Sequence, residues 1–268
     1  MSTLTLIGLG LISGAGAGLL AGLVGIGGGI VIVPVAYYGL IGAGFSADQA
    51  AHVAVATSLA AIMPAAVVSS ISHWRAGNAD IRFIRDWGPG IVFGVVAAQL
   101  TAPYVRGSVM TGVFALFTLT AAARFAAPGR FRPVFAESPN GSFRHVAGLA
   151  IGIVSGFAGV GGGILTNIVM AFSGLPMHKS IARAAAVGVI VSVPATIVAA
   201  LGSTTQSAGD LGAISLSMWA CIAPAQAVAA WFGAQLAQRI EADSLSRIFA
   251  AALTGTGLVM LYSSVGWP

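Results

Sequence analysis

Two glycine clusters are the part of this chain best suited to binding a small anion. The first comprises Gly25, Gly27, Gly28 and Gly29, and the second comprises Gly159, Gly161, Gly162 and Gly163. Three successive glycines are unfavourable within a helix, so each cluster predicts a break in an otherwise apolar segment. A helix that starts after such a break presents free N–H groups and the positive end of its dipole, and both attract anions. The alternative is a hairpin tip that only packs against its neighbours, and the sequence leaves both interpretations open.

Uncharged polar side chains close to the clusters could complete such a site. They are Thr57, Ser58 and Ser192 in the segments that follow the clusters, and Thr166 and Asn167 just beyond the second cluster. Hydroxyl and amide groups can hydrogen-bond an oxyanion without adding a charge, but in membrane helices they more often join one helix to another. Anion binding by each of these residues is therefore a hypothesis.

Three charged or titratable residues are candidates for moving protons or attracting an anion. Asp48 and His52 are four residues apart, so they lie on one face of a helix. Histidine titrates near neutral pH, so this pair could carry protons, although a solvated helix end is the favoured interpretation. With the prolines Pro64 and Pro194 aligned, Arg183 falls within a residue of the position equivalent to His52. It could attract an anion from the inside, although membrane topology also explains it.

The composition excludes a soluble protein. Hydrophobic residues make up 57% of the chain and charged residues 7%, whereas soluble domains contain about 25% charged residues. A spanning helix needs roughly 20 apolar residues. Uncharged stretches of about this length or longer occur at 1–47, 87–105, 107–123, 146–178, 184–209 and 211–238. Apolar and polar residues do not alternate as in a membrane β-barrel. The expected fold class is therefore all-α, a polytopic membrane protein.

The chain is a duplication of one unit. The decapeptide AGLVGIGGGI at Ala21 to Ile30 recurs as SGFAGVGGGI at Ser155 to Ile164, with six of ten residues identical and a shift of 134 in a chain of 268. We therefore predict a first membrane repeat at 1–125 and a second at 144–268. A cytoplasmic linker at 126–143 is expected to join them.

Loop charges indicate that the two repeats are inverted. Cytoplasmic loops of membrane proteins are enriched in Lys and Arg. The loop after the first cluster, 39–49, contains neither, whereas its counterpart carries Lys179 and Arg183. The loop with Arg75, Arg82 and Arg85 has a counterpart at 202–212 without a basic residue. Opposite charge in equivalent loops is expected when the repeats point in opposite directions, a common plan in transporters.

Inversion requires an odd number of membrane elements in each repeat. A simple count gives four long apolar segments in each half, and a turn at the glycine cluster divides one of them to give five. If the chain turns back at each cluster, it forms ten helical elements with two re-entrant, glycine-tipped hairpins. The second limbs, 30–38 and 164–172, would be about 14 Å long at 1.5 Å per residue, too short to cross the membrane. The competing arrangement has eight full spans in parallel repeats, with a kinked first helix in each.

Other classes of function have little support. No Asp or Glu is expected deep within a span, where such a residue would indicate proton or cation transport. Paired acids and hydrolase motifs are absent from the sequence, so we expect no enzyme and no cofactor. Cys221 is the single cysteine, which argues against a multi-cysteine metal site. The basic residues are scattered over short loops, which argues against nucleic-acid binding.

The chain resembles the TauE/SafE family of sulfite and organosulfur anion exporters. The resemblance rests on the duplicated G-x-x-G-x-G-G-G-I elements, on HVAVATSLAAIMP at His52 to Pro64, and on HWRAGNADIR at His73 to Arg82. It implies a multi-pass protein of the bacterial cytoplasmic membrane that moves sulfite, sulfoacetate, thiosulfate or a related small anion. The second repeat reads AAAVGVIVSVP where the first reads VAVATSLAAIMP, so Thr57 and Ser58 are not duplicated and any site should be asymmetric.

The leading hypothesis is a secondary transporter that works by alternating access around a site between the two glycine tips. Its expected partners are a small organic or inorganic sulfur anion and the lipid bilayer. The coupling ion, a proton or another ion, and the existence of a homo-oligomer stay open. The alternatives are a membrane-embedded scaffold or assembly protein without transport, and an anion channel.

Overall fold

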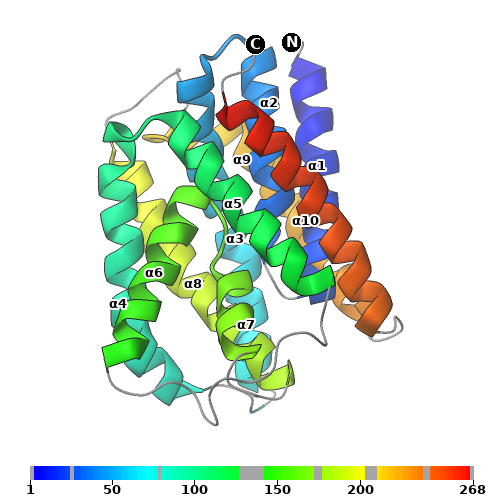
Figure 1. Cartoon of the computed structure of the whole chain (residues 1–268). Helices are drawn as coiled ribbons and strands as arrows, with labels where there is room; N and C mark the ends of the chain where they lie inside the picture. Colours follow the sequence, from blue (N-terminus) through cyan, green and yellow to red (C-terminus); the bar gives the residue numbers. More distant parts are fainter. Residues whose placement is uncertain are drawn as a thin grey trace.

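The computed structural model describes residues 3–24, 27–75, 77, 80–126, 142–171, 177–202, 210–237 and 242–265. Within these ranges the chain forms ten α-helices, one 3-10 turn and no strand beyond an isolated bridge (Figure 1). The all-α, polytopic prediction is therefore confirmed. Gly25 and the predicted linker 126–143, apart from its ends, lie outside the described residues.

Each half of the chain contributes five of these helices. The first half forms α1 (Thr3–Val24), α2 (Gly29–Gly42), α3 (Ala47–Arg75), α4 (Ile81–Thr101) and α5 (Gly107–Ala126), with the 3-10 turn η1 (Ala102–Tyr104) between the last two. The second half forms α6 (Ser142–Ala158), α7 (Gly163–Ala171), α8 (Met177–Leu201), α9 (Leu216–Ala237) and α10 (Ala242–Ser264). The glycine clusters separate α1 from α2 and α6 from α7, as the ten-element prediction requires.

The helix after each glycine cluster is short. α2 has 14 residues, and the described part of α7 has 9, which correspond to about 21 Å and 14 Å. Both are shorter than the roughly 30 Å of a hydrocarbon core. α2 continues to Gly42 and is thus longer than the limb expected from the sequence. Among the described residues, four helices are long and apolar enough to span a membrane: α3, α5, and the greater parts of α8 and α9.

The first helix of each half packs against the fourth helix of the other half. A Cβ built on Gly14 of α1 would lie 2.6 Å from the carbonyl oxygen of Ile222 in α9, and one on Gly10 would lie 2.7 Å from the Cβ of Cys221. Gly18 packs one turn further along both helices, against Gln226. α1 and α9 therefore run parallel, with backbones in close contact. Glycines four residues apart lie on one face of a helix and allow such close packing in a membrane.

α6, the first helix of the second half, packs in the same way against α4, the fourth helix of the first half. A Cβ built on Gly148 would lie 3.0 Å from the carbonyl oxygen of Trp87, and one on Gly156 would lie 2.7 Å from the Cβ of Ala98. These two helices also run parallel. The pair α1 and α9 in one part of the molecule thus has a counterpart, α6 and α4, built from the opposite halves.

Equivalent helices run in opposite directions. A Cβ built on Gly188 in α8 would lie 3.2 Å from the Cβ of Ala66 in α3, whereas Ala199, further along α8, clusters with Ala56 and Ala60, earlier in α3. These contacts make α3 and α8 antiparallel. In Figure 1, α1 starts at the upper end of the molecule, whereas α6 rises from the lower end and α7 descends again. The two halves therefore have the inverted arrangement that the loop charges predicted.

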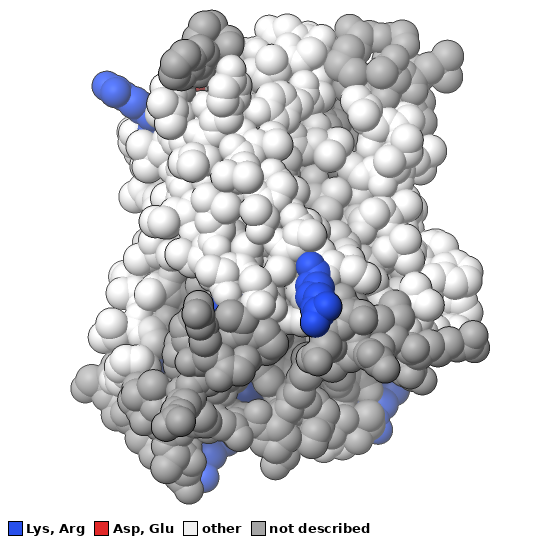
Figure 2. Space-filling model, turned by 45° about the vertical axis from the view of Figure 1, so that its right-hand side comes forward, with Lys and Arg blue, Asp and Glu red and all other residues white. Residues whose placement is uncertain are grey.

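Charge is concentrated at the ends of the molecule. Figure 2 shows a broad band without charged side chains, with most of the visible Lys and Arg toward the lower end. At that end of the molecule α3 finishes with Arg75, and α4 carries Arg82 and Arg85 in its first turns (Figure 1). A wide uncharged band with basic residues gathered at one end is the surface expected of a protein embedded in a membrane.

Candidate functional site

Both glycine clusters adopt backbone conformations that require glycine. The φ angles are +85° at Gly27, +71° at Gly28, +68° at Gly159 and +71° at Gly162. Residues with a Cβ are strained in this region, because the Cβ approaches the following carbonyl oxygen. Glycine thus lets the chain turn sharply before α2 and again before α7. We call residues 27–29 the first tip and residues 159–163 the second tip.

The two tips touch each other at the junction of the halves. A Cβ built on Gly27 would lie 3.8 Å from the Cα of Gly161. A Cβ built on Gly29 would lie 2.5 Å from the carbonyl oxygen of Gly159. A residue larger than glycine at position 29 would prevent this approach. The N-termini of α2 and α7 therefore meet in the same region, and each carries N–H groups without intrahelical partners and the positive end of a helix dipole.

Ser58 joins α3 of the first half to the second tip. It is fully buried, and its hydroxyl donates a hydrogen bond of 2.8 Å to the carbonyl oxygen of Gly159. The hydroxyl also lies 3.2 Å from the position that a Cβ on Gly29 would occupy. The prediction that Ser58 lies at the tips agrees with this geometry.

Gln226 of α9 holds the first tip, and the sequence did not indicate this role. Its side chain is fully buried, and its Nε2 donates a hydrogen bond of 3.0 Å to the carbonyl oxygen of Gly27. A Cβ on Gly28 would lie 2.8 Å from the same nitrogen. An amide in the middle of the apolar segment 216–233 was the available signal, since buried polar groups in membrane helices are costly without a partner or a function.

Three buried polar atoms in helices that contact the tips have no hydrogen-bond partner among the described residues. They are the Oγ of Ser155, the Oγ of Ser192 and the Oε1 of Gln226. Ser155 lies in α6, with its Oγ 3.3 Å from the position of a Cβ on Gly162, and is 1% exposed. Ser192 was predicted as a site residue and is fully buried in α8, one turn beyond Gly188. Buried polar atoms are normally paired with protein groups or water, so these three atoms are candidates for contact with a ligand.

The other uncharged candidates already have protein partners. Thr57 accepts a hydrogen bond of 3.0 Å from the backbone N–H of Ser215. Thr166 donates one of 2.9 Å to the carbonyl oxygen of Gly162, within the first turn of α7. Asn167 accepts one of 2.8 Å from the hydroxyl of Ser180. Thr166 still lies at the second tip, whereas Thr57 points from α3 toward the start of α9.

Asp48 and His52 bind the α4 to α5 connection. Asp48 accepts a hydrogen bond from the backbone N–H of Gly107 at the start of α5. The ring of His52 contacts the carbonyl oxygens of Asp48 at 2.7 Å, Ala102 at 2.9 Å and Val105 at 3.0 Å. The structure thus places this pair at the start of α3, where it holds the α4 to α5 connection, and does not bring it to the tips.

Arg183 lies near the opposite end and forms an ion pair. Its Nη2 lies 2.6 Å from the Oδ2 of Asp80, and its guanidinium lies 4.9 Å from the centre of the Phe83 ring. The side chain is 11% exposed. Asp80 also accepts a hydrogen bond from the N–H of Phe83 and so caps α4. Arg183 therefore connects α8 to the start of α4.

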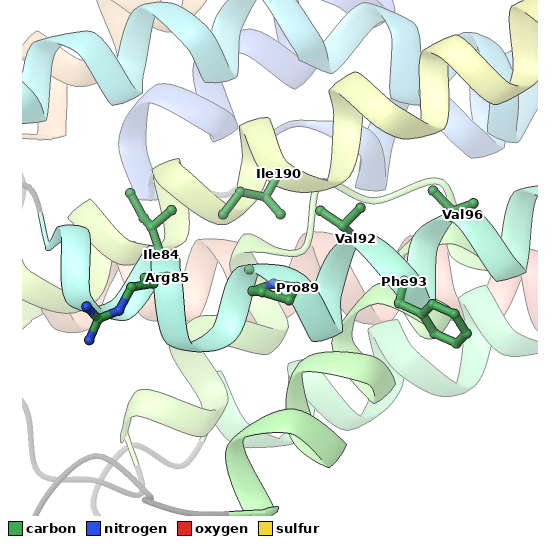
Figure 3. A pocket seen from close by; sticks show the side chains of 8 residues that line it. Ile84, Arg85, Pro89, Val92, Phe93, Val96 and Ile190 are labelled. Atoms are coloured by element: carbon green, nitrogen blue, oxygen red, sulfur yellow. The ribbon is translucent and has the colours of Figure 1, made fainter.

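A surface groove lies apart from the tips. It has a volume of 630 Å³ and is lined by side chains of α4 together with Ile190 of α8 (Figure 3). Its walls are almost entirely apolar, and none of the lining residues belongs to either tip. Because the glycine breaks form the tips and the three partnerless polar atoms lie in helices that contact them, we place the candidate binding site at the tips rather than in the groove.

Comparisons with known proteins agree over nearly the whole chain. The family described as sulfite exporter TauE/SafE matches residues 10–260. A "probable membrane transporter protein" of Haemophilus influenzae is 27% identical over 252 residues, covering 93% of this chain and 96% of that protein. Another of Methanocaldococcus jannaschii is 23% identical over 259 residues, covering 96% of each chain. No solved structure gives a significant match.

Proposed function

Because the chain belongs to the TauE/SafE sulfite exporter family and is a membrane transporter, we propose that it exports a small sulfur-containing anion through a site between the two glycine tips. The observation that carries the proposal is the meeting of two helix N-termini, together with three buried polar atoms without described partners in the helices that contact them. Sulfite, sulfoacetate and thiosulfate are the substrate candidates. The cytoplasmic membrane of a bacterium is the proposed location.

The electrostatics of the tips favour a singly charged anion. The residues that surround the tips carry no formal charge. Each helix N-terminus is equivalent to about half a positive charge. α1 and α6 end at the same tips, and their C-termini carry the opposite partial charge, so the four helix ends leave little net charge there. Burial of an anion in this region of low dielectric constant costs more for a double than for a single negative charge.

The hydrogen-bonding groups at the tips include one acceptor that an anion alone cannot satisfy. The hydroxyls of Ser155 and Ser192 can donate to an anion, but the Oε1 of Gln226 can only accept. A substrate with its own O–H group would satisfy this atom. Hydrogensulfite carries one negative charge and one O–H group, so it fits both features better than the sulfite dianion does.

Transport requires that the tips separate, because they are in contact in this structure. The bonds that must change are those from Ser58 to Gly159 and from Gln226 to Gly27. Both α3 and α8 contain an internal proline, Pro64 and Pro194, at which a helix can bend. We propose that these helices rock against each other and expose the site to each side in turn.

The sharpest test uses the hydroxyl of Ser155. A buried hydroxyl without a protein partner costs stability, so S155A should leave the melting temperature unchanged or raise it. The same variant should lower the rate of sulfite transport in proteoliposomes. S13A is the matched control, because Ser13 is buried in α1 and donates only to the carbonyl oxygen of Gly10 in its own helix. Wild-type transport by S155A would contradict the proposed site.

The assay also separates the alternative functions. A carrier saturates with substrate and shows counterflow, a channel shows neither, and a scaffold shows no anion flux. Comparison of transport at acidic and alkaline pH, at constant total sulfite, tests the charge of the substrate. We expect faster transport at acidic pH, where hydrogensulfite predominates. A thermal-shift panel of sulfite, sulfoacetate and thiosulfate then ranks the ligands, since a ligand that binds the native state stabilises it.

A further inference from the structure

The groove between α4 and α8 has the features of a site for a lipid acyl chain. Its lining comprises Ile84, Gly88, Pro89, Val92, Phe93, Val96 and Ile190, with Arg85 at one end. In Figure 3, Ile84, Val92 and Val96 lie on the side of α4 that faces Ile190 of α8, while the guanidinium of Arg85 lies toward one end. An apolar groove on the uncharged surface of a membrane protein is open to the lipid.

The length of the groove matches one leaflet of the bilayer. The lining runs along α4 from Ile84 to Val96, about 18 Å at 1.5 Å per residue. One leaflet contributes about half of the roughly 30 Å hydrocarbon core. A single acyl chain lying along α4 would thus start near the helix end and finish near the middle of the membrane.

The floor of the groove exists because α4 has a small residue there. Gly88 has no side chain, and a Cβ built on it would lie 3.8 Å from the Cδ1 of Ile190. Val92, one turn further, is 39% exposed and forms part of the wall. A large side chain at either position would occupy the groove.

The charge at the end of the groove indicates the headgroup. The side chain of Arg85 is 76% exposed, and its Nε lies 3.5 Å from the Oδ1 of Asp86. Arg144 binds the other oxygen of that carboxylate at 2.9 Å. Two arginines thus share one carboxylate, and a net positive charge remains at the membrane surface. Guanidinium groups bind phosphate strongly, and basic sites at helix ends bind anionic headgroups.

From this combination we propose that the α4 to α8 groove binds one anionic phospholipid, with an acyl chain along α4 and the phosphate on Arg85. The site is separate from the glycine tips and does not depend on the transported substrate. Because α8 supplies one wall, the bound lipid would contact the helix that is proposed to rock.

Thermal stability of the delipidated protein in detergent tests the proposal. The probes are dioleoyl phosphatidylglycerol, which is anionic, dioleoyl phosphatidylcholine, which has the same chains but no net charge, and glycerol phosphate, which has no chain. We expect the anionic lipid to raise the melting temperature by several degrees, the neutral lipid to raise it less, and glycerol phosphate to have no effect. Native mass spectrometry should show one retained anionic lipid per chain.

Two variants and two controls assign the effect to the groove. R85Q should reduce the shift with phosphatidylglycerol to that with phosphatidylcholine, whereas R82Q, which changes an exposed arginine outside the groove, should retain it. V92W should fill the groove and abolish both shifts. L100W, which changes an exposed residue of α4 outside the groove, should not.

Three results would overturn the proposal. The first is an unchanged preference for the anionic lipid in R85Q. The second is an equal shift with glycerol phosphate alone, which would indicate headgroup binding without the groove. The third is a wild-type dimer that V92W converts to a monomer without loss of bound lipid, which would identify a second copy of the chain as the occupant.

Discussion

The hydroxyl of Ser58 donates a hydrogen bond to the carbonyl oxygen of Gly159, 101 residues further along the chain. This bond joins α3, the third helix of the first half, to the second tip, where the chain turns between α6 and α7. The tip that it holds is in contact with the equivalent tip of the first half. Rearrangement of the two halves must therefore change the surroundings of this hydroxyl.

Substitution of Ser58 by alanine should impair both transport and stability. The change leaves a buried carbonyl oxygen without its donor, so the free energy of unfolding should fall by about 1–3 kcal/mol. We expect the transport rate in proteoliposomes to fall by roughly tenfold, equivalent to about 1.4 kcal/mol. T118A is the matched control, because Thr118 is also fully buried but donates within its own helix. Equal transport by the two variants would mean that Ser58 only packs.

Alanine at Gly28 or Gly162 should abolish transport. Each residue has a φ of +71°, where a Cβ costs about 1–2 kcal/mol. The added methyl group would lie 2.8 Å from the Nε2 of Gln226 in G28A, and 2.8 Å from a Cγ of Val187 in G162A. Both variants should lose anion transport and unfold at lower temperature.

Gly44 provides the control for these glycine variants. Its φ is +95°, but nothing lies within 4 Å of an added Cβ. G44A therefore experiences the backbone strain without the collision, and we expect modest destabilisation with normal transport. Wild-type uptake by folded G162A would exclude the second tip from the transport path.

A disulfide between α3 and α8 should test both the inverted arrangement and the proposed motion. A Cβ on Gly188 would lie 3.2 Å from that of Ala66, close to the separation of about 3.5–4.5 Å in disulfides. In a C221S background, A66C/G188C should cross-link on oxidation and stop transport until a reductant is added. A66C/A199C should not cross-link, because Ala199 packs near Ala56 and Ala60 instead. Cross-linking of the control pair alone would contradict the antiparallel packing.

Asp80 and Arg183 should behave as a structural pair. D80N and R183Q each remove a charged hydrogen bond between α4 and α8, so each should lower the free energy of unfolding by about 1.5–3 kcal/mol. The double variant should be little worse than either single one, because both changes remove the same interaction. If Arg183 instead attracts the anion, R183Q should raise the KM for sulfite strongly and D80N should not. Transport kinetics across a range of salt concentrations distinguish these results.

The sequence predicted the local features of the fold better than the contacts between halves. The glycine clusters, the ten elements and their inversion were accessible because glycine spacing and loop charge are properties of short segments. The specific role of Gln226 could not be predicted from the sequence, because Gln226 and Gly27 are 199 residues apart. Only the packing of α9 against α1 brings them together. Thr57 and Ser58 are neighbours in sequence, but about 100° of rotation per residue directs them to different partners.

The parallel pairing of α1 with α9 also determines how the protein can be assembled during synthesis. α1 emerges first from the ribosome, but the helix that fills its glycine face begins only at Leu216. Until then, that face has only lipid or a temporary neighbour beside it. α6, by contrast, finds α4 already in the membrane. If the two halves are produced as separate fragments, the first fragment lacks α9, the partner of α1. We therefore expect the two fragments to accumulate only when they are produced together.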